Sequence, residues 1–196
     1  MSKSNKPKEL DGRRLRSERS REAIIDAAIA LIEEGTLVAT AQQISERAEV
    51  GIRSFFRHFE DMEALARAVD EQIRESYEAL VLGGDRDGSI EERIEHAVER
   101  HAEVYEACTN IILSTQAQRW RYEFLQKNYA RMQRGLRKDL DNWLPELKKL
   151  SRQQREAVDA VASFEMWHRL REFQGQSKRA SNEIVASLVK SLIIGS

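Results

Sequence analysis

The sequence predicts an all-α protein of about nine helices, and three observations support this fold class. Only 9 Gly and 2 Pro occur among 196 residues, while residues that favour helix are abundant. Apolar residues recur at spacings of three and four, and no segment alternates as a half-buried strand does. Hydrophobic residues make up 41% of the chain, which is enough for a sizeable core. We therefore expect a flexible basic arm at 1–17, a three-helix domain at 18–60 and a larger helical domain at 61–196.

The three-helix domain has clear helix boundaries. Apolar residues repeat at helical spacing over 21–34, and Gly35 follows them as a typical C-terminal cap. Thr40 and Gln43 have the spacing of a capping box, which predicts the start of a short second helix. A turn then leads to a third short helix over residues 52–58.

The next segment contains a long helix and an evident loop. Asp61 is placed to cap a helix that continues to Val81. Residues 83–88 include three glycines and two aspartates, which predicts a loop. Ser89 and Glu92 form a second capping-box pattern, so another helix begins there.

The remaining sequence predicts three more long elements. After a short apolar piece at 108–114, a strongly charged helix is expected from about 115 to 143, where Pro145 stops it. A third capping box precedes a helix over 152–173. The last helix follows Gly175.

The first 21 residues are basic although the net charge of the chain is −1. They hold eight Lys or Arg and three Asp or Glu, so that eight minus three gives +5. Such an arm suits contact with a polyanion, which makes Arg14 and Arg16 candidate DNA contacts. The alternative is a solvated, disordered tail.

Residues 41–60 have the pattern of a helix-turn-helix. In this motif two short helices cross closely, so apolar residues face inward at fixed spacing and the second helix presents polar side chains to a DNA groove. The inward positions are Ile44, Ala48, Val50, Phe55 and Phe59, and the outward ones are Arg53, Ser54, Arg57 and His58.

The same region resembles the tetracycline-repressor (TetR) family of transcriptional regulators. The resemblance covers about residues 20–66 and is carried by Thr40, Ile44, Ala48, Val50, Ser54, Phe55, Phe56, His58, Phe59, Glu63 and Leu65. It implies a homodimer that binds a palindromic double-stranded DNA operator, with repression as the common outcome. It also implies a pocket for a small-molecule effector in the C-terminal helices, and dimerisation through the last two helices.

Four residues depart from the family pattern. Glu49 stands where a turn glycine is usual, which costs about 1–2 kcal/mol if its backbone is left-handed. Gly51 replaces a capping serine, while Phe56 and Met62 replace a tyrosine and a lysine that often contact phosphate. These departures favour an alternative function, a helical interaction protein of the same fold that has lost specific DNA reading.

The motif nevertheless suggests a set of DNA contacts. We expect Arg53 and Arg57 to contact phosphates or guanine edges, and Thr40 and Ser54 to bond phosphate. Phe56 is expected to pack against sugar or to hold the recognition helix in place. His58 has two open interpretations, a structural hydrogen-bonding residue or a DNA contact.

The C-terminal helices contain candidates for a ligand pocket and a dimer interface. The helix at 152–173 is apolar on more than one side, which predicts burial against a second subunit as well as its own, although a monomer with these helices wholly inside remains the alternative. Interface candidates are Val158, Val161, Ile184, Leu188 and Leu192. Candidate pocket residues are Tyr77, His101, Tyr105, Cys108, Ile112, Trp120, Phe124, Phe164 and Trp167.

No pattern in the sequence indicates an enzyme, a metal site or a bound cofactor. Glu165 and His168 have the spacing used twice in di-iron bundles, but a second copy is absent. The single Cys108 cannot form an internal disulfide, so a reducing cytoplasm is the expected location. No apolar stretch is long enough to span a membrane, and no secretory signal is evident.

Overall fold

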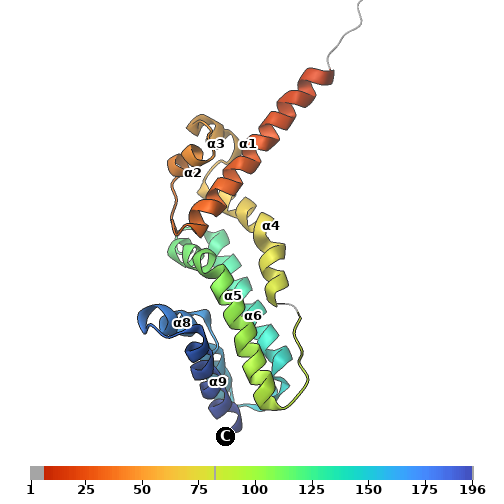
Figure 1. Ribbon diagram of the computed structural model, residues 1–196. Coiled ribbons are helices and arrows are strands. Elements are labelled where there is room, and N and C mark those ends of the chain that lie inside the picture. The colour runs from red at the N-terminus through yellow and green to blue at the C-terminus, as the bar shows by residue number, and fades with distance from the viewer. Residues whose placement is uncertain (1–6, 82, 196) are drawn as a thin grey trace, which may run out of the picture. The chain divides into compact units, whose positions relative to one another are not determined.

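The computed structural model describes residues 7–81 and 83–195, and this part of the chain is all-α, as the sequence predicts (Figure 1). It contains nine α-helices, one 3-10 helix and one π-helical turn. The chain divides into two compact units. Among the described residues, unit 1 comprises 7–74 and 110–127, and unit 2 comprises 75–81, 83–109 and 128–195.

Unit 1 is organised around a small core shared by three N-terminal helices. These are α1 (Pro7–Glu33), α2 (Ala41–Arg47) and α3 (Ile52–His58), followed by the first part of α4 (Met62–Val81). Figure 1 shows α2 and α3 beside the C-terminal part of α1, and all three pairs of these helices are in contact. The core consists of Ile24, Ile25, Ala27, Ala28, Ile44, Phe55, Phe59, Leu65, Ala68 and Val69.

The end of α5 (Ile90–Gln118) also belongs to unit 1 and is fixed to the segment after α1. Ser114 Oγ and Gln118 Nε2 both donate to the carbonyl of Leu37, at 2.7 and 3.2 Å. Asn110 Nδ2 donates to the carbonyl of Glu33 at 2.9 Å. Because carbonyls at the end of a helix lack partners within it, the bond from Asn110 stabilises the C-terminus of α1, and the two bonds to Leu37 fix the segment that follows.

The turn between α2 and α3 has a left-handed residue at Glu49. Its φ of 54° makes it the one non-glycine residue with positive φ in the described part of the chain. The amides of Glu49 and Val50 donate to the carbonyls of Glu46 and Ser45, at 3.2 and 3.0 Å. This pair of bonds is a Schellman motif, which ends a helix with a left-handed residue that is usually glycine. The conformation suspected from the sequence is therefore present.

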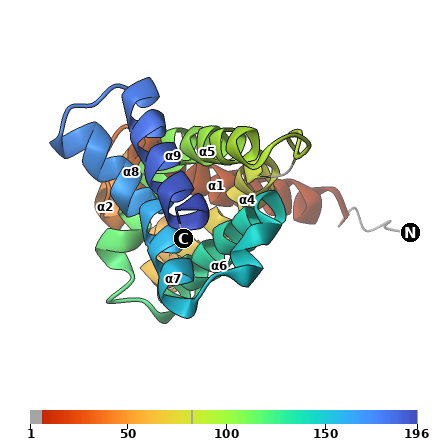
Figure 2. The same ribbon diagram turned by 90° about the horizontal axis from the view of Figure 1, so that it is seen from below.

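Unit 2 has a second core. It is formed by the first part of α5, most of α6 (Glu123–Trp143), the 3-10 helix η1 (Pro145–Lys149), α7 (Arg152–Val161), α8 (Phe164–His168), the π-helical turn η2 (Arg169–Phe173) and α9 (Lys178–Ile194). Figure 2 shows α7 beside α9, in agreement with their mutual contacts. The buried members are Ile94, Ala97, Val98, Leu140, Trp143, Leu144, Leu147, Val158, Ala162, Leu170, Val185 and Val189.

A buried carboxylate links three segments of unit 2. Asp139 Oδ2 accepts from Trp143 Nε1 at 3.0 Å and lies 3.1 Å from His101 Nε2. Arg86, in the loop before α5, donates to Asp139 Oδ1 at 2.9 Å. Gly84 of the same loop lies so close to Trp143 that an added Cβ would be 2.6 Å from the indole ring. Hydrogen bonding and close packing therefore fix this loop against the core.

The structure corrects three predicted elements. Residues 7–17, expected as a flexible arm, are part of α1, and the rest of the expected arm (1–6) lies outside the described residues. The charged helix expected from 115 is interrupted at 119–122, because α5 continues to Gln118 and α6 starts at Glu123. The helix expected over 152–173 is also interrupted, since Ser163 caps a new helix by accepting from the amide of Met166.

The predicted capping boxes are confirmed. In each box the hydroxyl accepts from the backbone amide three residues later, and that residue's side chain accepts from the amide of the cap. The three pairs are Thr40 with Gln43, Ser89 with Glu92, and Ser151 with Gln154. Asp61 also caps α4 as expected, because its Oδ1 accepts from the amide of Ala64 at 2.7 Å.

Replacing Glu49 with glycine should stabilise the protein. The left-handed backbone costs a non-glycine residue about 1–2 kcal/mol, while glycine adds about 0.5–1 kcal/mol of backbone entropy to the unfolded chain. We therefore expect Glu49→Gly to raise the free energy of unfolding by about 0.5–1 kcal/mol in urea titrations. The control Glu46→Gly, in right-handed helix three residues earlier, should lower it by about 1 kcal/mol. A loss of stability in Glu49→Gly would contradict this account.

Candidate nucleic-acid interface

The position of α3 is determined by one aromatic residue. Phe55 is completely buried and is the one buried residue among the seven of α3. Its ring contacts Phe59, with centroids 5.9 Å apart, and lies in the core with Ile24 and Ile44. Since successive helical residues point about 100° apart, burying Phe55 directs its neighbours outward.

The outward side of α3 carries two arginines and an aromatic ring. Arg53, Phe56 and Arg57 are all exposed, and their spacing of three and four residues places them on one face of the helix. Phe56 is 54% exposed, although its edge contacts the ring of Phe55 at a centroid distance of 5.2 Å. Arg57 Nη2 donates to Ser54 Oγ at 2.8 Å. The face is thus cationic around an apolar centre.

The α2 side of the motif leaves few polar groups unused. The Thr40 hydroxyl is exposed, but it takes part in the capping box with Gln43. Arg47 forms an ion pair with Glu34, with Nη2 and Oε1 2.6 Å apart. Gly51, the N-cap of α3, provides no side-chain hydrogen bond. Outward contacts of this motif therefore depend mainly on α3.

His58, at the end of α3, lies in a cationic setting. Its Nε2 is buried and has no hydrogen-bond partner among the described residues. Desolvation, followed by the charges of Arg57 and Arg21, holds the pKa of His58 below its usual value. Arg21 also lies over the ring of Phe59, 5.3 Å from its centroid. The neutral, partly buried imidazole fits a structural residue better than a DNA contact.

Arg14 and Arg16 are exposed on α1, in a helix and not in a flexible arm. Arg14 Nε donates to Glu18 at 2.9 Å, and Arg16 Nε donates to the carbonyl of Gly12 at 3.2 Å. Both contacts lie on the helix surface, and an exposed ion pair such as Arg14–Glu18 contributes little to stability. These guanidiniums are consequently accessible to a polyanion.

Four of the nine candidate pocket residues form one aromatic cluster in unit 2. Tyr105 contacts His101, Phe164 and Trp167, with centroid distances of 6.1, 5.7 and 5.9 Å. The Tyr105 hydroxyl donates to the carbonyl of Ala162 at 2.7 Å, and burial raises the pKa of this phenol.

Little open space remains beside this cluster. The cavity lined by His101, Tyr105 and Trp167 has a volume of about 10 Å³, which is room for no more than one water molecule. Trp167 Nε1 is buried with no hydrogen-bond partner among the described residues. The expected ligand pocket is therefore closed here, although it has an unused donor.

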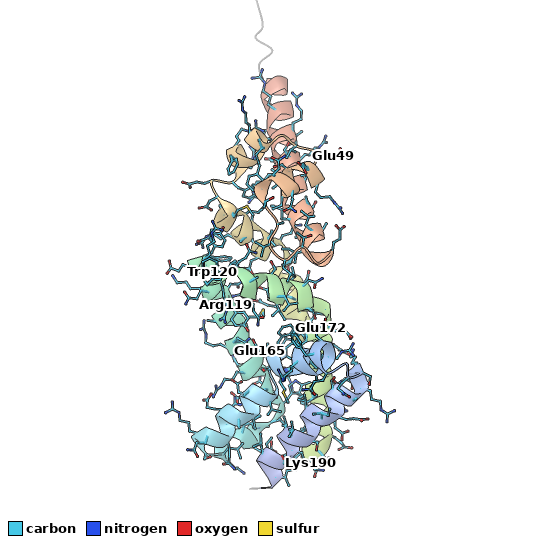
Figure 3. The ribbon with its side chains drawn as sticks, turned by 90° about the vertical axis from the view of Figure 1, so that its left-hand side faces the viewer. Glu49, Arg119, Trp120, Glu165, Glu172 and Lys190 are labelled. Atoms are coloured by element: carbon cyan, nitrogen blue, oxygen red, sulfur yellow. The ribbon has the colours of Figure 1, made fainter. Side chains whose placement is uncertain are left out.

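The other five pocket candidates lie elsewhere. Tyr77 accepts from Arg131 at 2.6 Å, Cys108 is buried with a thiol pKa raised by desolvation, and Ile112 is buried. Trp120 is 81% exposed at the turn between α5 and α6, where Figure 3 shows it beside Arg119. Phe124 lies under Arg67, 4.5 Å from the guanidinium. Ile112, Trp120 and Phe124 belong to unit 1, so the nine residues do not form one pocket.

Two polar residues in unit 2 were not predicted from the sequence. Asp139 is buried in a helix that reads as a charged surface element, and Arg86 lies in a loop. Neither position carries a local signal, because only the tertiary structure brings them together.

The Glu165 and His168 pair has packing partners, since Tyr129 donates to Glu165 and His168 stacks on Phe164 with ring centroids 5.1 Å apart.

The structure corrects one expected dimer-interface residue. Val158 is completely buried in the core of its own unit, so it cannot contact a second subunit. Val161, Ile184 and Leu192 are partly buried against the same core, whereas Leu188 is 38% exposed on α9. The surface of α9 also carries a depression of about 740 Å³ shared with α5, whose lining residues include Glu95, Glu99, Lys178 and Arg179.

Within the described part of the chain, no helix is long and apolar enough to cross a membrane.

Comparisons with known proteins agree with this geometry. Residues 24–69 match the family model described as bacterial regulatory proteins, tetR family. The fold is similar to that of a transcriptional regulator from Rhodococcus sp. Rha1, with a TM-score of 0.65 at 14% identity over 91% of this chain and 96% of that one. It is also similar to a proposed transcriptional regulator from Streptomyces coelicolor A3(2), with a TM-score of 0.57 at 22% identity over 87% and 98% of the two chains. No curated protein that was compared matches the chain.

The environment of His58 predicts acid sensitivity of the folded state. Because its pKa is lower in the folded chain, the unfolded chain takes up a proton first as the pH falls below about 6.5. The contribution of neutral His58 to the free energy of unfolding is therefore complete above about pH 6.5, and it is lost as the pH falls through the pKa of His58 in the folded chain. Urea titrations at pH 7 and pH 5 should show a smaller loss for His58→Gln than for the parent. Equal losses of stability in both proteins would show that His58 does not cause the acid sensitivity.

Proposed function

Because this chain belongs to the tetR family of bacterial transcriptional regulators, we propose that it is a homodimer that binds a palindromic DNA operator and represses transcription. The observation that carries the proposal is the exposed, cationic face of α3, which is held outward by the buried Phe55. A recognition helix of this kind enters the major groove and contacts base edges.

The proposed DNA contacts have different roles. Arg53 and Arg57 contact guanine edges or phosphates, since a guanidinium suits both. Ser54 Oγ accepts from Arg57 and keeps its own proton for a phosphate, whereas Thr40 bonds phosphate only by giving up its hydrogen bond to Gln43 Oε1. Arg14 and Arg16 add sequence-independent attraction along the backbone, which depends on salt concentration.

Dimerisation is proposed through the outer face of α9. Ala180, Ile184, Leu188 and Ser191 follow helical spacing and are partly or fully exposed in the single chain. Two-fold symmetry would place two recognition helices about 34–36 Å apart, as successive major grooves require.

A small-molecule effector is proposed to act on the aromatic cluster of unit 2. The support for this site is the buried, unused indole N–H of Trp167 beside Tyr105 and His101. Because the present cavity holds about 10 Å³, binding requires a more open form of the cluster. The effector would then change DNA affinity by its different affinity for the two forms.

The central experiment is selection of bound sequences from a random double-stranded DNA pool near physiological salt. We expect enrichment of a palindrome with half-sites about one helical turn apart. On that sequence, Arg53→Ala and Arg57→Ala should each weaken binding by about 1–3 kcal/mol if the arginine contacts guanine. If the arginine contacts phosphate, the slope of log K against log salt concentration should become shallower by about one. The charge-matched control is Arg179→Ala, whose side chain is exposed on α9 and pairs with Glu183. Failure of a folded protein to enrich any sequence would favour the alternative, an interaction protein without specific DNA reading.

The interface prediction can be tested separately. Leu188→Glu should convert the dimer into a folded monomer. In the proposed dimer the substitution buries two like charges close together, which opposes association. In the monomer the side chain at 188 is exposed to solvent, so the fold tolerates the charge. Light scattering after size-exclusion chromatography measures the mass, and circular dichroism checks the fold. Val158→Ala should lower stability by about 1–3 kcal/mol without changing the mass, since Val158 lies in the protomer core. A dimeric Leu188→Glu variant would place the interface elsewhere.

A further inference from the structure

We propose that Phe56 reads the 5-methyl group of a thymine in the major groove, next to bases contacted by Arg53 and Arg57. This inference rests on the proposed function and makes it more specific, because it assigns a base-reading role to the one aromatic side chain on the outward face of α3. The prediction that Phe56 packs against sugar is the competing assignment.

The first argument is the exposure of the ring. Phe56 is 54% exposed, whereas the adjacent Phe55 is completely buried and fills the core position of α3. Phe55 therefore provides the buried contact that holds α3 against α1 and α2, while the ring of Phe56 packs edge-on against Phe55 with centroids 5.2 Å apart. An exposed phenyl on a surface that meets DNA gains free energy when a partner covers it.

The second argument is position. Phe56 lies three residues after Arg53 and one before Arg57, on the face that both arginines share. If that face meets the floor of the major groove, the guanidiniums and the phenyl ring meet it together. Arg57 also donates to Ser54 Oγ at 2.8 Å, which orients one of its nitrogens along the helix and leaves its other donors for DNA.

The third argument is chemical complementarity. A phenyl ring has no group that can hydrogen-bond a phosphate, so the one contact it can make with the DNA backbone is apolar packing against a sugar. In the major groove, the apolar group that distinguishes one base from the others is the thymine methyl, and phenylalanine is among the side chains that contact it. Guanidiniums on either side favour guanine through O6 and N7. The face therefore fits a half-site in which thymine is adjacent to guanine.

The test removes the methyl group and nothing else. In the operator recovered by selection, each thymine of both half-sites is replaced in turn by deoxyuridine, and binding is measured for the parent and for Phe56→Ala. Loss of one buried methyl should weaken parent binding about fourfold for each half-site, or about fifteenfold for a symmetric pair. Phe56→Ala should bind the thymine operator more weakly than the parent and should bind both operators equally.

Two further variants control for folding and for surface hydrophobicity. Val38, in the turn between α1 and α2, is also 54% exposed, so Val38→Ala removes exposed apolar surface from the same unit, in a smaller amount than Phe56→Ala. It should discriminate between thymine and deoxyuridine as the parent does. Phe56→Leu keeps an apolar side chain and should retain part of the discrimination.

The outcomes separate this inference from the proposed function. An enriched palindrome on which deoxyuridine has no effect at any position overturns the reading by Phe56 and leaves the regulator intact. Equal sensitivity of the parent and Phe56→Ala to deoxyuridine overturns it as well, as does a uniform loss of Phe56→Ala binding on all DNA, which would indicate a sugar contact. Absence of any enriched sequence overturns the proposed function and this inference with it.

Discussion

The proposed DNA-binding surface of this protein depends on the burial of Phe55. The ring has no exposed surface, and it occupies the centre of the contact among α1, α2 and α3. A seven-residue helix has too few hydrogen bonds to be stable alone, so tertiary packing must hold it. Because Phe55 is the one fully buried side chain of α3, the directions of Arg53, Phe56 and Arg57 follow from helical geometry. The outward face of α3 is thus held in place by the core beneath it.

Unit 2 is stabilised by a different principle. Its core surrounds the carboxylate of Asp139, which contacts Trp143, His101 and Arg86 from three segments of the chain. A buried carboxylate of this kind is costly unless its oxygens are hydrogen-bonded, so loss of one partner leaves Asp139 with an unsatisfied acceptor. The same network fixes the loop before α5, where Gly84 packs against Trp143. Polar satisfaction and apolar packing therefore restrain this region together.

The sequence predicted the elements whose signals are local and missed those that depend on tertiary contacts. Capping boxes at Thr40, Ser89 and Ser151 correctly located three helix starts, since hydroxyl and carboxamide or carboxylate groups act within one turn. Helix interruptions at 119–122 and at Ser163 were missed, because helical periodicity continues through both. Of the outward positions expected on α3, Arg53 and Arg57 are exposed, whereas Ser54 and His58 are partly buried. The burial of Val158, the closure of the aromatic cluster and the exposure of Trp120 could not be predicted, since hydrophobicity alone does not say which partner covers a side chain.

The place of Val158 bears on how the protein responds to its own abundance. Because Val158 and the residues around it are buried within a single protomer, we expect the protomer to fold without a second chain, and assembly of the proposed dimer is then a separate equilibrium. Below the dissociation constant of the dimer, its concentration rises with the square of the concentration of the protein. Operator occupancy would then change more steeply than protein level, so that a modest fall in synthesis or a few cell divisions could release the controlled gene. A protein whose core formed only on association would give no pool of folded monomers to draw on.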